Sequence, residues 1–159
     1  MSELPLRRKY RFKVHGRSVL LVKRAWESEE HVLLKILGFA LYLPRYPRLI
    51  IEPRMDDRYR PDLVQLDERG RPLFWGECGT VGMAKLRRLA RRHRQTHLAF
   101  FQWEPELEHY VALIEKAVAG LRRAGPVELV GFPLDAATRF VADDGTVSVR
   151  FDDCTVIGF

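Results

Sequence analysis

The chain has 159 residues, of which 47% are hydrophobic and 30% are charged, and its formal net charge is +6. This length predicts one domain over residues 1–159, with enough apolar side chains to bury a core. The longest strongly apolar run, residues 36–43, is far shorter than the roughly 20 residues that span a bilayer. Because the N-terminus also lacks an apolar signal core, we expect a cytoplasmic protein with no membrane association.

The basic excess favours a polyanionic partner, with DNA or RNA foremost. Only six of the 27 basic residues are lysines, and such arginine richness can equally reflect genome composition or a hot habitat. The two cysteines, Cys78 and Cys154, form no CxxC pair. We therefore expect neither a disulfide framework nor a structural zinc site.

The first elements follow from hydrophobic periodicity. Residues 10–14 and 18–23 predict two strands joined by a turn at residues 15–17. Ser28 is a predicted N-cap, followed by Glu29 and Glu30, where the helix dipole favours acids. Apolar residues at helical spacing extend this helix to about residue 43, and residues 49–51 predict a short buried strand.

Residues 62–77 predict a β-hairpin with a turn at residues 67–70. If residues 69 and 70 form the loop, antiparallel pairing places Asp62 opposite Glu77. A loop two residues longer keeps both acids on one face, because side chains alternate along a strand. That face is otherwise apolar, with Val64, Leu66, Leu73 and Trp75. Two acids on an apolar face are costly without a cation or hydrogen bonds, so the pattern indicates a divalent-metal site.

The chain after Gly79 predicts a helix with Leu86 and Leu89 on its apolar face, then a strand over residues 97–103. A helix from Pro105 to about residue 120 and a strand over residues 127–132 follow. The tail predicts strands at residues 139–142, 147–151 and 155–159. This order predicts one α/β domain: a mixed central sheet flanked by helices, with β-hairpin additions at both ends.

The element order, with a Pro-Asp and a Glu on the hairpin, resembles the PD-(D/E)XK (restriction-endonuclease-like) nuclease superfamily and, within it, the YaeQ family. The matching blocks are residues 27–40, Arg60-Pro61-Asp62-Leu63, Gly70, Trp75-Gly76-Glu77-Cys78-Gly79 and residues 85–88. The likeness covers roughly residues 10–103. It implies a sheet of the restriction-endonuclease-like type and metal-dependent cleavage of a phosphodiester bond.

Asp62 and Glu77 are the candidate ligands for Mg²⁺ or Mn²⁺, since hard cations prefer carboxylate oxygens. Glu29 or Glu30 would supply a third acid from the first helix. The bland alternative is that Asp62 merely begins a strand, that Glu77 is paired by an arginine, and that the helix acids reflect a helix-start preference.

The superfamily's usual lysine, two residues after the Glu, is Gly79 here. The YaeQ family also has glycine there, which implies a relocated lysine or a different chemistry. Lys85, about two helical turns on, is the candidate catalytic lysine, with a solvated helix face as the alternative. On the same helix, four arginines are candidate phosphate contacts, or else solvated surface: Arg87, Arg88, Arg91 and Arg92.

The remaining candidate residues are expected to have structural roles. Trp26, Trp75 and Trp103 are expected to be core anchors rather than base-stacking platforms. His93 and His97 have i, i+4 spacing but no HExxH motif, so we expect surface histidines. Cys78 should face away from Glu77 as a buried thiol.

Three functions remain open at this point. The first is a metal-dependent phosphodiesterase that uses Asp62, Glu77 and Lys85. The second is a catalytically inactive nuclease-fold protein that binds nucleic acid through its arginine helix. The third is a protein-interaction module whose acids are structural. Metal binding separates the first from the others, and salt-sensitive nucleic-acid binding separates the second from the third.

Overall fold

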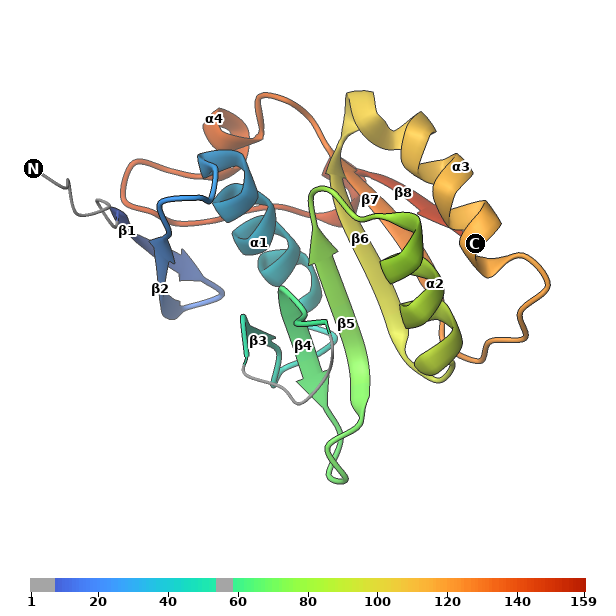
Figure 1. Cartoon of the computed structure of the whole chain (residues 1–159). Helices are drawn as coiled ribbons and strands as arrows, with labels where there is room; N and C mark the ends of the chain where they lie inside the picture. The colour runs from blue at the N-terminus through green and yellow to red at the C-terminus, as the bar shows by residue number, and fades with distance from the viewer. Residues whose placement is uncertain (1–7, 54–58) are drawn as a thin grey trace, which may run out of the picture.

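The computed structural model describes residues 8–53 and 59–159. Its centre is a six-stranded mixed sheet in the order β3-β4-β5-β6-β7-β8, and β1 and β2 form a separate antiparallel hairpin (Figure 1). The strands are β1 (Arg8–Val14), β2 (Arg17–Lys23), β3 (Ile50–Ile51), β4 (Leu63–Leu66), β5 (Pro72–Cys78), β6 (His97–Trp103), β7 (Val127–Phe132) and β8 (Thr155–Gly158). Strands β5, β6 and β7 are parallel, and the outer pairs are antiparallel. The predicted single α/β domain with a mixed sheet is confirmed.

The helices cover both faces of this sheet. They are α1 (Glu29–Tyr42), α2 (Met83–Arg92), α3 (Leu107–Val118) and the short α4 (Ala136–Phe140), with 3₁₀ turns η1 (Glu104–Glu106) and η2 (Phe151–Asp153). Helix α1 lies on one face, and α2 and α3 lie together on the other (Figure 1). None of the helices in the described part of the chain has the length and apolarity that a membrane crossing requires.

Side-chain alternation along β5 divides the core in two. Phe74 and Cys78 pack with α1 and the N-terminal hairpin. Trp75 packs instead with α2 and α3. Cys78 is therefore a buried thiol on the face opposite Trp75, as the alternation predicted.

Helix α1 begins as the sequence predicts. The Ser28 hydroxyl accepts a hydrogen bond from the His31 N–H at 3.1 Å, which caps the first turn. From Leu34 to Tyr42 every residue is buried, because α1 lies between the sheet and the β1–β2 hairpin. Burial on all sides makes its C-terminal half the most enclosed helical segment of the domain.

The predicted register of the β4–β5 hairpin is confirmed, but the predicted two-residue loop is wrong. Leu63 pairs with Gly76 and Val64 with Trp75, which is the register that sets Asp62 beside Glu77. The loop is longer than two residues, and a bulge between Gln65 and Leu66 shifts the pairing there. The Asp67 carboxylate closes the turn by accepting N–H bonds from Arg69 and Arg71. An Asx-type turn thus replaces the two-residue loop.

The predicted C-terminal strands at residues 139–142 and 147–151 do not form, and one antiparallel bridge remains of that hairpin. Residues 136–140 form α4, whose Ala136 and Phe140 bury one helical face. Residues 147–151 make only an isolated bridge, between Val141 and Val147, before η2. Strand β8 is present, but it extends the central sheet beside β7. The α4 segment is too short for its period to stand out in the sequence. Ile50 in β3 is also half exposed, at 51%, because β3 is an edge strand.

Candidate metal and phosphodiester site

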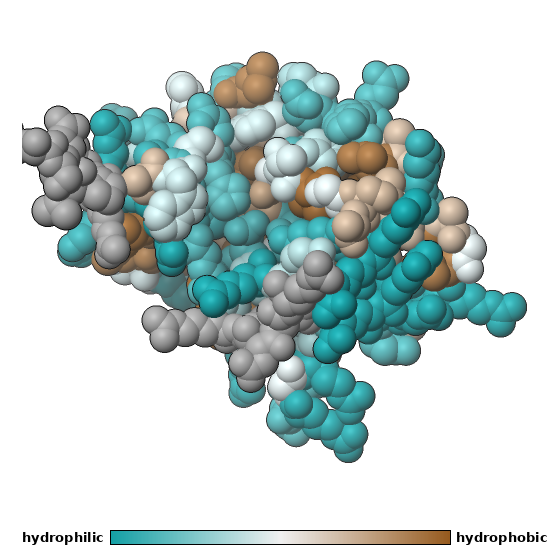
Figure 2. Space-filling model, viewed as in Figure 1, coloured by the Kyte–Doolittle hydropathy of each residue, from teal (hydrophilic) through white to brown (hydrophobic). Residues whose placement is uncertain are grey.

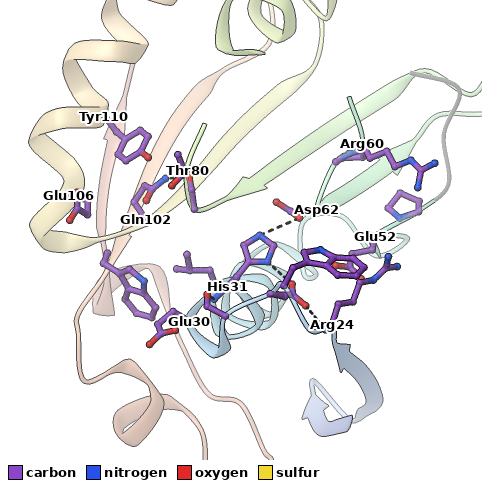
Figure 3. A pocket seen from close by; sticks show the side chains of 18 residues that line it. Arg24, Glu30, His31, Glu52, Arg60, Asp62, Thr80, Gln102, Glu106 and Tyr110 are labelled. Atoms are coloured by element: carbon purple, nitrogen blue, oxygen red, sulfur yellow. Dashed lines mark hydrogen bonds and ion pairs between the residues drawn. The ribbon is translucent and has the colours of Figure 1, made fainter. Parts of the chain in front are cut away.

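A cleft of about 1000 Å³ opens at the carboxyl ends of the parallel strands β5 and β6. Gly79 and Thr80 line it just beyond β5, and Gln102 and Trp103 line it at the end of β6. The opposite wall is the start of α1, with Glu30 and its neighbours (Figure 3). Open α/β sheets bind ligands at the carboxyl ends of their strands, so this cleft is the candidate site.

Asp62 enters the cleft from the beginning of β4. Its backbone N–H donates to the Gly76 carbonyl at 3.1 Å, and its Oδ2 accepts the Cys78 N–H at 2.8 Å. These two bonds fix Asp62 and its carboxylate against the C-terminal end of β5. Oδ1 lies 3.6 Å from His31 Nε2, so an acid from the sheet faces a base from α1.

His31 lies between two carboxylates. Its Nδ1 is 2.5 Å from Glu27 Oε2, while Nε2 faces Asp62, and both contacts are drawn in Figure 3. The interaction with the Asp62 carboxylate is the largest cause that raises the pKa of His31 to about 9, against the opposing effect of burial. His31 is therefore an imidazolium at neutral pH.

Lys35 lies beneath this wall and has no exposed surface. Its ammonium contacts Glu27 Oε2 and Glu52 Oε1. Burial alone would raise the pKa of Glu27, but the hydrogen bonds from Lys35 and His31 outweigh it and the net shift is downward. The site thus contains a line of alternating charges, which we call the α1 charge chain: Asp62, His31, Glu27, Lys35 and Glu52.

Glu77 is on the α2 side of the sheet and is only 3% exposed, whereas the Asp62 carboxylate faces α1, so the expectation that both acids lie on one face is wrong. Glu77 and Lys85 are not among the described residues that line the cleft. Trp75 Nε1 donates to Oε1 at 2.8 Å, and Lys85 Nζ donates to Oε2 at 2.8 Å. Burial is the main reason that the pKa of Glu77 rises to about 7, and the charge of Asp62 raises it further. Lys85 thus pairs with Glu77 instead of lying free on a solvated helix face, and the residue that pairs Glu77 is a lysine and not an arginine.

The first-turn acids of α1 have different surroundings. Glu30 is exposed and lines the cleft. Glu29 points elsewhere, because its carboxylate accepts from Arg8 at 2.7 Å and from the Tyr10 hydroxyl at 3.0 Å. Of these two candidate ligands, the geometry brings Glu30 and not Glu29 to the site.

The four candidate arginines lie on α2, over which Figure 2 shows a hydrophilic surface. Arg87, Arg91 and Arg92 are exposed, while Arg88 is half-buried with its guanidinium 5.9 Å from the Tyr59 ring centre. None of the four is among the described residues that line the cleft. They form a basic surface beside the site rather than part of it.

Sequence analysis missed most of the α1 charge chain. Glu27, His31 and Lys35 repeat at strict i, i+4 spacing, and this period places them on one helical face. That signal was available but is common on solvated helices. Glu52 could not be found, because it reaches Lys35 only through the tertiary fold.

Two predictions about ring side chains are wrong. Trp26 is 79% exposed at the rim of the cleft, whereas Trp75 is fully buried, as expected of a core anchor. His97 is not a surface histidine: it is 5% exposed, with Nδ1 2.7 Å from the Tyr46 hydroxyl and Nε2 on Glu128. Contacts with Tyr46 and with Glu128 on β7 explain why His97, on β6, can be buried.

Mg²⁺ or Mn²⁺ fits the oxygen donors of Asp62 and Glu77 by chemistry. Across the described residues, however, no group of three or more His, Cys, Asp or Glu side chains is arranged to hold a metal ion. Both oxygens of Glu77 already accept hydrogen bonds. A cation shared by the two carboxylates must therefore compete with the Lys85 ammonium.

No protein-family model matches this sequence, and no curated protein matches it either. The structure is similar to that of the YaeQ protein from Pseudomonas syringae, with a TM-score of 0.59 and 21% identity over 89% of this chain and 81% of that one. It is also similar to the YaeQ protein from Xanthomonas axonopodis pv. citri, with a TM-score of 0.54 and 20% identity over 78% and 72%. These similarities show a shared fold.

Proposed function

We propose that this chain belongs to the YaeQ family within the PD-(D/E)XK superfamily and is a metal-dependent phosphodiesterase that acts on nucleic acid. The observation that carries the proposal is the Asp62–Glu77 pair. Asp62, just before β4, and Glu77, in β5, lie near enough for the charge of Asp62 to raise the pKa of Glu77, and each faces a cationic side chain from a different helix, His31 from α1 and Lys85 from α2. The pKa values of His31 and Glu77 are both shifted, and shifted pKa values are typical of active sites.

Each residue then has a role. Asp62 and Glu77 would hold the cation, with Glu30 as a third oxygen donor from the cleft wall. A bound Mg²⁺ or Mn²⁺ ion supplies an acidified water and offsets charge on a phosphate. Lys85 would stabilise the negative charge that develops on the phosphate. His31, which lines the cleft, would hold the Asp62 carboxylate in place.

We expect Asp62→Asn to weaken Mn²⁺ binding about ten-fold or more, because it removes one of two anionic ligands. Glu77→Gln should do the same. Lys85→Met should have the opposite effect and tighten binding, since it frees Glu77 Oε2 from its ammonium partner. Titration calorimetry with Mn²⁺ and Mg²⁺ measures all three variants. Binding that is identical in wild type, D62N and E77Q would reject the metal site.

Cleavage of plasmid or oligonucleotide is the second readout for these proteins. We expect weak, Mn²⁺-favoured activity, because Gly79 stands where the superfamily has lysine and a small misplacement of a catalytic group can cost ~100-fold. Lys85→Met should lower cleavage even as it tightens metal binding. Rapid cleavage in Mg²⁺ that K85M leaves unchanged would remove Lys85 from the mechanism.

The arginine helix makes a separate prediction about nucleic-acid binding. Replacing Arg87, Arg88, Arg91 and Arg92 with alanine should weaken binding and flatten its dependence on salt, because fewer phosphate contacts release fewer counterions. Fluorescence anisotropy over a salt series measures both quantities. Replacing Arg11, Arg122, Arg139 and Arg150, four exposed arginines outside α2, is the control that removes the same net charge. An equal loss in the control would show a general charge effect.

The alternative function is a catalytically inactive nuclease-fold protein that binds nucleic acid or a protein partner. The ion pairs favour this alternative, since Lys85 and Lys35 are both engaged by carboxylates within the chain. Metal binding without cleavage, together with salt-sensitive nucleic-acid binding, would select it.

A further inference from the structure

Trp26 has an unusual position for so large an apolar side chain. It is 79% exposed, more than any other large apolar residue in the described part of the chain, and it lines the rim of the cleft. Tryptophan side chains are, on average, largely buried in folded proteins. This exposure at the rim leaves the indole accessible to a ligand in the cleft.

We propose that Trp26 is a stacking platform for an unpaired base, and that the cleft receives single-stranded nucleic acid rather than an intact duplex. The proposal rests on the proposed function and adds the strandedness of its substrate. It assigns to Trp26 a role in binding the substrate rather than in the chemical step.

A backbone turn fixes the point from which the Trp26 side chain extends. Residues 24–27 form a turn that is closed by a hydrogen bond from the Glu27 N–H to the Arg24 carbonyl at 3.0 Å. Glu27 Oε1 in turn accepts the Arg24 N–H at 3.4 Å, while Oε2 binds His31 and Lys35. The Trp26 backbone is thereby tied to the α1 charge chain, which includes Asp62.

The surroundings of Trp26 suit a nucleotide. The Arg24 guanidinium lies 5.5 Å from the indole ring centre, and Arg60 lines the same cleft. In Figure 3 Arg24 and Arg60 lie on one side of the cleft, and Gln102 and Tyr110 lie on the other. Single-strand binding proteins commonly combine aromatic side chains, which stack on bases, with basic side chains such as arginine, which contact phosphates.

Stacking on an exposed ring favours single strands for a physical reason. In a duplex, both faces of each base already stack on neighbouring bases, so a base must be extruded before an indole can reach it, at a cost of a few kcal/mol. A single strand offers open base faces without that cost. The cleft volume of about 1000 Å³ is also large enough for more than one base.

The test compares a labelled oligothymidylate with a labelled duplex of the same length, using anisotropy at low salt and the full chain. Trp26→Ala should weaken single-strand binding about five-fold or more, and Trp26→Phe should restore most of it, because phenylalanine keeps a stacking face. Duplex binding should change less than two-fold. Leu73→Ala, an exposed apolar position at the other end of β5, is the matched control and should change neither.

Three results would overturn the inference: no oligothymidylate binding by the wild type, unchanged affinity in W26A, or an equal loss on the duplex. Mn²⁺ titration of the same variants separates this inference from the proposed function. W26A should bind Mn²⁺ like wild type, while D62N should not. Loss of single-strand binding in W26A, in a protein that binds no metal, would support the platform and reject the phosphodiesterase.

Discussion

Replacement of Lys35 by methionine is expected to lower the free energy of unfolding by about 3 to 5 kcal/mol, the usual cost of breaking a buried ion pair. The side chain is 1% exposed and its ammonium contacts Glu27, whose side chain is 7% exposed. Methionine fills the space but leaves the Glu27 carboxylate without its lysine partner. Glu52 contributes less, because its side chain is 36% exposed. Chemical denaturation measures the effect.

Two further variants make the Lys35 prediction specific. Lys35→Met combined with Glu27→Gln should recover part of the lost stability, since the second change removes a buried carboxylate that has only His31 left as a partner. Lys116→Met, at an exposed position on α3, should stay within about 0.5 kcal/mol of wild type. A Lys35→Met protein as stable as wild type would show that Lys35 is not needed to neutralise the α1 charge chain.

The metal-free protein should lose stability as the pH rises from about 4.5 to about 7 because of Glu77. Its carboxyl has a pKa of about 7 in the fold against an ordinary value of 4.5, so the folded state binds more protons than the unfolded state in this window. The contribution of Glu77 protonation to the free energy of unfolding is fully present below pH 4.5 and is lost as the pH passes 7. A difference of this size corresponds to about 3 kcal/mol.

Glu77→Gln isolates the Glu77 contribution from every other titrating group. The variant cannot ionise at position 77, so the free energy of unfolding of Glu77→Gln minus that of wild type should increase between pH 4.5 and pH 8 in a chelator. Denaturation curves at several pH values provide this difference. A difference that stays constant with pH would mean that Lys85 and Trp75 keep the Glu77 carboxylate fully ionised in the fold.

The two ion-pair arrangements of the site have a common consequence. His31 and Lys35 balance acids on the α1 side, and Lys85 balances Glu77 on the α2 side. Both carboxylates proposed as metal ligands are therefore already compensated by side chains of the same chain. This explains why metal binding and catalysis are expected to respond in opposite directions to Lys85→Met.

Local sequence alone determined most of the elements. Helix α1 and strands β6 and β7 were predicted almost to the residue, because α1 has a helical period and an N-cap and the two strands are short apolar runs. The pairing of Asp62 with the end of β5 also followed from strand alternation, even though the loop length was wrong. Register depends on the apolar pattern over several residues, and one bulge near the turn does not change it.

Tertiary structure decided the chemistry of the site. The sequence placed Glu77 and Lys85 eight positions apart, but only the packing of α2 against β5 shows that they touch, and only burial raises the pKa of Glu77. Glu52 and Lys35 likewise meet across 17 positions. The exposure of each tryptophan could not be predicted from local sequence either, since Trp26 is exposed and Trp75 is buried. Local patterns report period and caps, whereas contacts between distant segments and access to water depend on how the whole chain packs.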